Sequence, residues 1–577
     1  MMKDRESVLE VIDMEDSTNL LNGYENTRYV HYTESATLPN TVFYDEIEGK
    51  DVTGVLKASW HVNGRLMQTY SEQENHVGVI AATRLGKTTS YVIPTILSFA
   101  RQRTKKSMII SDPKGEIYRY TSATLREEGY RVILLNFRDY LHSECWNMLT
   151  PIFRKYKKID RIIDEVTVVE TENGFRNKFR GRVYETQPEL DEDIQRAMDL
   201  QLGEVGNDID NVASMFIETK KENDPYWEDS ARDVLKAFLW AMLEDSDPKN
   251  CTNPITEDTF SFNTILTIIA TFRDDEGTYY NDEGYFTNRE STSRAYSLAK
   301  NTLIENGRPT RKCIMATLMT KLSVFNEVAM RLITSCNSFE ISEIAGGPIA
   351  IFIDYRDELK VHYQVISLFI QDAYRFLIEQ ANEKPAGKLD VPVYFILDEF
   401  GNFPAIKDFE TTISACAGRN IFFILIIQSY AQLSSVYSME VAEIIRDNLN
   451  VHVFFGSNNP STLEAFSHEC GLRTRISPLS ALNGKGAEID TYQIETIPLV
   501  PKSKLSRFES GECIITEANS GYVMFSKLER YYLCDEFKNL KLATEKDYTC
   551  SVNPFDKRYT YVMAKGKKRS RSIFDDD

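Results

Sequence analysis

The 577-residue sequence has no Cys-x-x-C pair, and its nine cysteines are scattered along the chain. This spacing excludes a zinc ribbon or a dense disulfide framework, and it favours a reducing, cytoplasmic compartment. The sequence also has no signal peptide and no run of the ~18 apolar residues that a membrane span requires. The longest apolar runs, such as Ile421–Ile427, have the length of a strand. We therefore expect a chain without a membrane-spanning segment.

Positive charge is in deficit, because 67 basic residues face 86 acidic ones and the formal net charge is -19. This balance argues against a surface coated for nucleic acid, so any contact with DNA must be local. Phosphate contacts from such local sites would be independent of base sequence, although most charge runs are only solvated surfaces. The candidate basic clusters are 101–106, 154–158, 176–182 and 565–571, with Tyr156 and Phe179 interleaved.

Apolar runs of strand length alternate with helical patterns in two separate parts of the chain. The first part holds runs at 76–82, 107–111 and 132–136, and the second holds four more between residues 348 and 455. This rhythm predicts an α/β fold, a RecA-like P-loop ATPase domain interrupted by a mostly α-helical insertion. The predicted limits are 1–50 for an N-terminal segment, 51–155 and 346–540 for the nucleotide-binding domain, 156–345 for the insertion and 541–577 for a partly disordered tail.

The strongest local motif is a Gly-Lys-Thr turn between a predicted strand and a predicted helix. In such loops backbone N–H groups hold the phosphates of a nucleotide, the lysine reaches the β- and γ-phosphates, and the next hydroxyl binds Mg²⁺. We assign these roles to Lys87 and Thr88 of a site for ATP and Mg²⁺. Alanine occupies position 81, where glycine is usual, and a left-handed backbone there would cost about 1 kcal/mol. The loop residues expected around the phosphates are Ala81, Ala82, Thr83, Arg84, Leu85, Gly86, Lys87, Thr88 and Thr89.

A second motif lies far downstream, where the apolar run 391–397 ends in Asp398-Glu399. Carboxylates at the ends of parallel strands face the ligand crevice of such sheets. We expect Asp398 to hold a water ligand of Mg²⁺ and Glu399 to orient and deprotonate the attacking water. A water base also separates a hydrolytic motor from a P-loop kinase, which transfers phosphate to a bound acceptor.

Two further polar residues flank the run Ile421–Ile427. Gln428 follows it, and a carboxamide there can donate to a γ-phosphate oxygen and accept from the water. Arg419 precedes it and has two interpretations of near-equal weight. It is either a cation that completes the site of a neighbouring subunit or a surface arginine.

Together with the P-loop, four other elements occur in the order found in the type IV coupling proteins, hexameric ATPases of conjugation and type IV secretion. The similarity extends with gaps from residue 77 to residue 532. Met148 replaces the proline that the family usually has in its Trp-Asn-Pro-Leu turn. The four elements that resemble family signatures are Ser-Asp-Pro-Lys-Gly-Glu at 111–116, Cys-Trp-Asn-Met-Leu at 145–149, Leu-Asp-Glu-Phe at 397–400 and Gln-Ser-Tyr-Ala-Gln-Leu at 428–433.

The resemblance implies a homo-hexameric ATPase that delivers DNA, single-stranded and carrying relaxase or relaxosome proteins, to the components of a type IV secretion channel. The insertion would be the all-α domain that meets cargo at the cytoplasmic mouth of the ring. Family members usually begin with membrane-spanning helices. We expect none in this sequence, which implies a separate membrane partner or a truncated variant. On the first alternative the chain would reach the cytoplasmic face of the bacterial cell membrane through that partner.

Two alternatives remain open on the residues alone. The first is a coupling ATPase for protein effectors, which the acidic balance mildly favours. The second is a non-catalytic adaptor in which Ala81 marks a degenerate nucleotide pocket. Retention of Lys87, Thr88, Asp398 and Glu399 argues against the adaptor.

Overall fold

The computed structural model describes residues 28–31, 40–50, 52–171, 174–217, 225–272, 282–356, 358, 360–482, 488–518, 520, 522–538, 540–544, 547–548, 551, 553 and 555–560. The first 27 residues and the basic cluster 565–571 lie outside this set. The chain folds as two compact units. The first consists of Met1–Leu134, Ile341–Asp357 and Ala373–Asp547, and the second of Leu135–Glu340, Glu358–Asp372 and Tyr548–Asp577.

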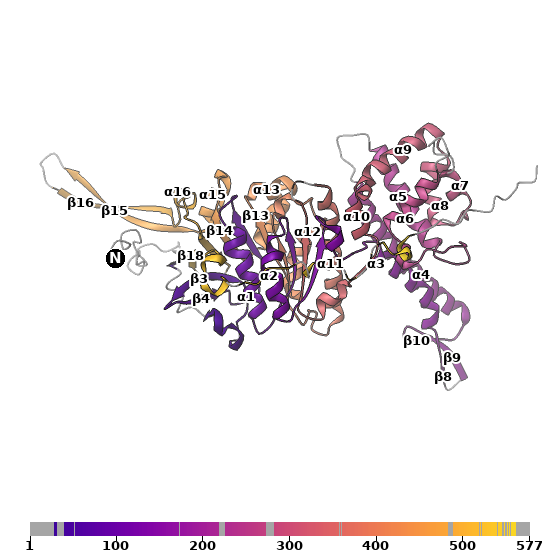
Figure 1. Ribbon diagram of the computed structural model, residues 1–577, viewed down its shortest axis with the longest axis horizontal. Coiled ribbons are helices and arrows are strands. Elements are labelled where there is room, and N and C mark those ends of the chain that lie inside the picture. Colours follow the sequence, from indigo (N-terminus) through magenta and orange to yellow (C-terminus); the bar gives the residue numbers. More distant parts are fainter. Residues whose placement is uncertain are drawn as a thin grey trace, which may run out of the picture. The chain divides into compact units, whose positions relative to one another are not determined.

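The first unit is built on a ten-stranded mixed sheet (Figure 1). The strands from β14 to β11 run parallel, and the antiparallel strands β17 and β18 extend the sheet beyond β14. In spatial order the strands are β1 (Arg28–His31), β18 (Tyr522–Lys527), β17 (Glu512–Glu517), β14 (Val451–Gly456), β5 (Val77–Ala81), β13 (Ile421–Ile427), β12 (Val393–Leu397), β6 (Ser107–Asp112), β11 (Ile349–Asp354) and β7 (Arg131–Asn136).

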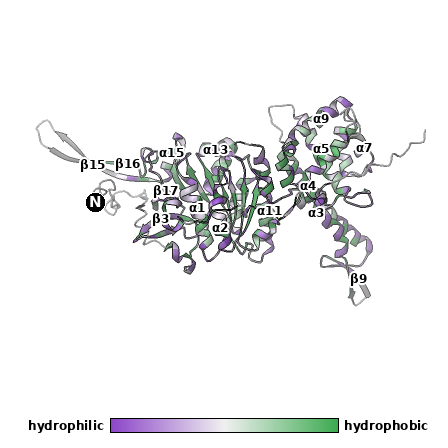
Figure 2. Cartoon of the chain, in the orientation of Figure 1, coloured by the Kyte–Doolittle hydropathy of each residue, from purple (hydrophilic) through white to green (hydrophobic). Residues whose placement is uncertain are grey.

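The central strands are buried on both faces. Every residue of β5, β12 and β13 is buried, which explains why these segments read as continuous apolar runs and not as alternating patterns. Figure 2 shows hydrophobic residues concentrated along these strands. Because crossovers between parallel strands are right-handed, α1 and α2 cover one face, and α12, α13 and α14 cover the other. The covering helices are α1 (Ile93–Arg101), α2 (Glu116–Glu127), α12 (Phe409–Cys416), α13 (Tyr430–Val436) and α14 (Met439–Asp447).

Two parts of this unit have no counterpart among the elements predicted from the sequence. A three-stranded antiparallel sheet precedes the P-loop strand, and a long two-stranded hairpin lies between α15 and α16. These elements are β2 (Thr41–Phe43), β3 (Leu56–Val62), β4 (Arg65–Tyr70), β15 (Leu472–Leu482), β16 (Glu488–Pro498), α15 (Pro460–Glu469) and α16 (Lys502–Leu505).

The second unit is mostly helical. Its central helix, α5, is buried on all sides from Ala237 to Leu243, as expected for a helical segment that is apolar all round and surrounded by others. Within the described ranges, no helix combines the length and the apolar character needed to cross a membrane. The elements are α3 (Thr150–Ile162), β8 (Thr167–Thr171), β9 (Gly174–Phe179), β10 (Arg182–Tyr184), α4 (Gln187–Phe216), α5 (Tyr226–Glu244), α6 (Phe262–Thr271), α7 (Asp282–Thr287), α8 (Arg294–Ala299), α9 (Arg308–Lys321) and α10 (Val328–Ile333).

The fold class predicted from the sequence is confirmed: an α/β P-loop domain is interrupted by a mostly helical insertion. The second unit begins at Leu135, earlier than residue 156, and takes in Glu358–Asp372, the first part of α11 (Lys360–Glu383). The domain limits given above stay a prediction.

Candidate functional site

Three neighbouring parallel strands, β5, β13 and β12, end at the same edge of the sheet. The P-loop follows β5, Gln428 follows β13, and Asp398-Glu399 follow β12. Because β13 lies between the other two, its terminal glutamine falls between the phosphate loop and the carboxylates. The carboxyl edge of a parallel sheet is where α/β proteins bind ligands.

Ala81 is the last residue of β5, is fully buried and does not have a positive φ. The alanine at this position therefore needs no left-handed backbone and carries no strain of that kind. The left-handed positions of the loop are Arg84, with φ 71°, and Gly86, with φ 89°. The Ala82 N–H donates to the Gly456 carbonyl at 2.9 Å, which ties the start of the loop to the end of β14. The start of the P-loop is thus also tied to β14, the strand that lies on the other side of β5 from β13.

Lys87 lies between the two downstream carboxylates. Its Nζ is 2.9 Å from Asp398 Oδ1 and 2.5 Å from Glu399 Oε1, and its side chain is 13% exposed. Burial on its own would lower the pKa of Lys87, but the two carboxylates outweigh it and hold that pKa above its ordinary value. The lysine is therefore a fixed cation at this edge. Thr88 Oγ1 donates to Asp398 Oδ2 at 3.4 Å, which places the second predicted metal residue beside the first.

Glu399 has a left-handed backbone, with φ 56° and ψ 35°. This conformation costs a residue with a side chain about 1–2 kcal/mol, and such strain concentrates at functional sites. The Asp398 side chain stabilises it by accepting from the Glu399 N–H at 2.9 Å. Gln428 Nε2 donates to Glu399 Oε2 at 3.1 Å. The carboxylate is consequently held between a lysine and a carboxamide, the arrangement expected of a base that must face one water.

Several supporting residues were not predicted. The carbonyl of Asp398 accepts from Ser111 Oγ at 3.0 Å, and the Gln428 N–H donates to Gln432 Oε1 at 2.9 Å. A methyl group added at Gly401 would lie 2.7 Å from that same Gln432 oxygen, so this glycine is needed for a close approach. Gln432 belongs to the Gln-Ser-Tyr-Ala-Gln-Leu element, and that element is the one signal that could have found it.

Two more aspartates end the adjacent strands β6 and β11. Asp112 pairs with Asp354 in the register of these strands, and Asp112 is buried. Burial, together with the nearby Asp354 and Asp398, raises the pKa of Asp112 to about 8, although the hydrogen bond from the Tyr118 N–H works in the opposite direction. Asp112 accepts that N–H at 2.8 Å and so caps the turn into α2. The Asp-Pro-Lys-Gly-Glu turn predicted at this edge is thus built around a buried, uncharged acid at neutral pH.

Arg419 is not brought to this edge within the subunit. It ends the short helix before β13, and its Nη1 donates to the Ala415 carbonyl at 2.8 Å while its Nε donates to Asn382 Oδ1 at 3.3 Å. It therefore lies at the amino end of the strand whose carboxyl end carries Gln428. A role at a neighbouring subunit's site stays a prediction.

The predicted basic clusters are largely compensated within the subunit. In the first, Lys106 pairs with Glu74, and in the second Arg154 pairs with Glu257 and Glu340. In the third, Arg180 pairs with Glu165 and Arg182 with Asp193.

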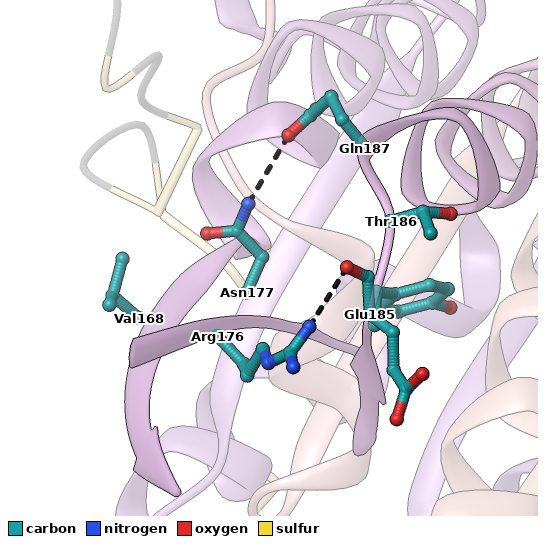
Figure 3. Close-up of a pocket in the computed structure, with 7 residues that line it drawn as sticks. Val168, Arg176, Asn177, Glu185, Thr186 and Gln187 are labelled. Atoms are coloured by element: carbon teal, nitrogen blue, oxygen red, sulfur yellow. Dashed lines mark hydrogen bonds between the residues drawn. The ribbon is translucent and has the colours of Figure 1, made fainter. Parts of the chain in front are cut away.

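Beside the third cluster lies a cavity of about 400 Å³, shown in Figure 3. The Arg176 side chain on its wall donates to the Glu185 carbonyl, and Asn177 donates to Gln187. None of the predicted nucleotide residues lines it. The residues that line it are Val168, Arg176, Asn177, Tyr184, Glu185, Thr186 and Gln187.

Comparison with known proteins identifies the family. The family model described as "Type IV secretory system Conjugative DNA transfer" matches residues 39–553. The conjugal transfer protein TraG of Escherichia coli is 20% identical over 446 residues, which are 75% of this chain and 61% of TraG. VirD4 of Agrobacterium fabrum is 21% identical over 404 residues, which are 69% of this chain and 50% of VirD4. The chain thus spans between half and two thirds of the length of these relatives.

The fold is also that of a solved coupling protein. The unbound monoclinic form of the bacterial conjugative coupling protein TrwBdeltaN70 matches with a TM-score of 0.50 and 14% identity, covering 85% of this chain and 92% of that one. The prediction of a type IV coupling protein is confirmed at the level of the family. The chain belongs to the type IV secretory system conjugative DNA transfer family.

Proposed function

We propose that this chain hydrolyses ATP to deliver DNA, or DNA with attached protein, to a type IV secretion channel. The observation that carries the proposal is the convergence of the five predicted residues on the carboxyl edge of one sheet. Lys87, Thr88, Asp398, Glu399 and Gln428 are joined there by direct hydrogen bonds or ion pairs. A P-loop lysine, a pair of acids at a strand end and a carboxamide together match the parts that nucleotide hydrolysis requires.

Each of these residues has a separate role in the proposed hydrolysis. The loop N–H groups and Lys87 would bind the phosphates, and Glu399, held by Gln428 at 3.1 Å, would orient a water and take its proton. Thr88 would supply a hard oxygen ligand of the kind that Mg²⁺ prefers, and Asp398 would hold one of its water ligands. Magnesium, when bound, would neutralise charge on the phosphates.

Lys87 has to change partners in this scheme. Its Nζ contacts both carboxylates, whereas a P-loop lysine acts on phosphate. Phosphate binding would draw the ammonium away and leave Glu399 with Gln428 as its remaining partner. The base is therefore released when the nucleotide arrives. This exchange gives the site a simple means of limiting hydrolysis to the loaded state.

We infer the cargo and the assembly of this protein from its family. We propose a homo-hexamer at the cytoplasmic face of the membrane, held by a membrane partner and fed with single-stranded DNA carrying relaxase or relaxosome proteins. DNA binding should be insensitive to base sequence and should weaken steeply as salt rises, because counterions are released from the phosphates. A binding constant that does not change with salt would contradict DNA contact through phosphates.

Arg419 is proposed to act on the γ-phosphate of the adjacent subunit. An arginine supplied in trans raises turnover by roughly 10³-fold or more, so hydrolysis should depend on assembly. Arg419→Ala protein and Lys87→Ala protein should each be inactive and should regain part of the activity when mixed. If mixed rings form and remain inactive, or if Arg419→Ala alone keeps full activity, Arg419 is a surface residue.

The decisive experiment is a steady-state ATPase assay with no DNA, with single-stranded DNA and with double-stranded DNA. Stimulation by DNA supports the proposed cargo. Hydrolysis without stimulation would instead favour the coupling ATPase for protein effectors. Absence of hydrolysis in an assembled protein would leave the non-catalytic adaptor, although Ala81 closes a strand and gives no reason for a degenerate pocket.

A further inference from the structure

Arg530 is an arginine beside the P-loop that the mechanism above does not use. It lies between β18 and a short helix, η12 (Tyr531–Leu533), and η12 packs against η3 (Thr88–Val92), the helical segment that continues the P-loop. A methyl group added at Gly86 would lie 3.6 Å from Arg530 Nε. A residue far from the loop in sequence therefore places a cation directly against the loop glycine that precedes Lys87.

Arg530 differs from many arginines of this protein in having no carboxylate partner among the described residues. Its Nη1 donates to the Tyr532 hydroxyl at 2.6 Å, whereas its Nε is buried without a hydrogen-bond partner among the described residues. No carboxylate in the described part of the chain forms an ion pair with it. A buried N–H of a cation without an acceptor is unfavourable, and an anion is the acceptor that would satisfy it best. Arginines that are paired with carboxylates include Arg65, Arg126, Arg154, Arg180, Arg182 and Arg289.

The backbone around Arg530 is fixed, so its position is not accidental. The Leu528 N–H donates to the Gly511 carbonyl at 2.8 Å, and the Arg530 carbonyl accepts from the Leu533 N–H at 2.8 Å. Tyr531 is buried against Tyr120 of α2, with ring centroids 5.2 Å apart. The segment is thus held on both sides of Arg530. Because the backbone is already fixed, ligand binding would not have to order this segment.

We propose that Arg530 binds the phosphates that ADP and ATP share, in the same subunit as the P-loop. The loop N–H groups around Gly86 cradle the α- and β-phosphates, whereas Lys87 reaches the β- and γ-phosphates. Arg530 lies beside Gly86, so its donors serve the phosphates that remain after hydrolysis. In this assignment Arg530 binds the nucleotide within its own subunit. Arg419 instead lies at the amino end of β13, at the other edge of the sheet from the P-loop. This inference rests on the proposed nucleotide site.

The test is nucleotide affinity measured by calorimetry with Mg²⁺·ADP and with a non-hydrolysable Mg²⁺·ATP analogue. Arg530→Ala should weaken both nucleotides by a similar factor, roughly tenfold to a hundredfold, and Arg530→Lys should recover part of the loss. Arg131→Ala is the matched control, because Arg131 is exposed at the amino end of the outermost strand β7, and it should leave both affinities unchanged. If Arg530→Ala does not melt cooperatively, Arg530→Gln, which keeps a polar side chain without the charge, takes its place.

The outcomes separate this inference from the function it rests on. Unchanged affinity in a folded Arg530→Ala or Arg530→Gln protein, with normal binding by the natural protein, overturns the role of Arg530 and leaves the nucleotide site intact. A loss confined to the triphosphate analogue overturns the assignment to the shared phosphates. Failure of the natural protein to bind either nucleotide overturns the proposed function itself.

Discussion

Two lysines of the same sheet are each paired with buried carboxylates, at opposite edges. At the carboxyl edge, Lys87 is 13% exposed and contacts Asp398 and Glu399. At the amino edge, Lys106 is 0% exposed, its Nζ is 2.8 Å from Glu74 Oε1, and it also donates to Gln102. The two ion pairs have the same chemistry. They differ in their access to solvent and in the groups around them.

The pKa shifts of the two lysines have opposite signs for this reason. Two carboxylates hold the pKa of Lys87 above its ordinary value despite burial, whereas complete burial lowers the pKa of Lys106 and one carboxylate, Glu74, only partly offsets it. Glu74 also accepts from the Tyr394 hydroxyl at 2.6 Å, so both of its carboxylate oxygens already have a donor. Arg84 and Glu399 at the carboxyl edge have left-handed backbones, whereas the left-handed residue just before β13 at the amino edge is Asn420, a type that tolerates this conformation. We therefore interpret the Lys87 ion pairs as part of a ligand-binding site and the buried Lys106–Glu74 ion pair as a contribution to the stability of the fold.

The largest effect should come from breaking the pair at the carboxyl edge. Lys87→Ala removes the fixed cation predicted on the β- and γ-phosphates, so turnover should fall by at least about 10²–10³-fold. The melting temperature should fall less than for a change at the fully buried Lys106, because Lys87 and Glu399 are 13% and 15% exposed and solvent can screen the remaining charge. Phosphate release together with thermal melting measures both. A Lys87→Ala protein with normal turnover would remove the P-loop assignment.

The matching change at the amino edge should act on stability instead. Lys106→Met leaves Glu74 buried without its cation and should lower the free energy of unfolding by about 3–5 kcal/mol. Turnover per folded molecule should be kept. Urea titration measures the loss, and adding Glu74→Gln should restore much of it. If Lys106→Met abolished turnover in the folded protein, the contrast between the two edges would not hold.

A smaller effect on stability, this one dependent on pH, is expected at the amino edge. Burial lowers the pKa of His76, just before β5, to about 4, and its Nδ1 accepts from the Phe423 N–H at 3.0 Å. In the unfolded chain His76 is protonated below about pH 6.5, and in the folded chain only below about pH 4. The contribution of neutral His76 to the free energy of unfolding is therefore full above pH 6.5 and is lost as the pH falls toward 4. The loss amounts to at most about 3 kcal/mol.

Denaturant titrations at about pH 7 and about pH 4.5 measure this loss, and His76→Gln should reduce the difference between them. An equal difference in the variant would assign the acid sensitivity to other groups.

Much of the fold and of the site could be predicted because both depend on short-range pattern. Parallel strands buried on both faces must be apolar throughout, so β13 was predicted with its observed limits. The ends of such strands meet at one edge, which is why Asp398, Glu399 and Gln428 could be assigned to one site with the P-loop. The cost considered for a left-handed Ala81 does not arise, because that residue completes β5 and the left-handed positions are Arg84 and Gly86.

The remainder depends on contacts that leave little trace in sequence. Arg530 approaches Gly86 only through the packing of η12 on η3, and nothing near residue 530 marks it. The sequence at 154–204 is rich in charge and poor in apolar pattern, yet it folds as α3, a small sheet and most of α4. The five residues of one buried hydrophobic cluster in this stretch are too widely spaced to show a period: Ile162, Phe179, Tyr184, Leu190 and Ala197. The register of the β15–β16 hairpin is likewise set by pairing between strands.

The central claim is that the carboxyl edge hydrolyses ATP with Glu399 as the water base, and the most direct test is Glu399→Gln. The glutamine keeps the shape and can still accept from Gln428, so ATP binding should be retained. Phosphate release, measured on the same samples as ATP affinity, should fall by about 10²–10⁴-fold because the water loses its base. A Glu399→Gln protein that binds ATP and releases phosphate at the natural rate would contradict the account.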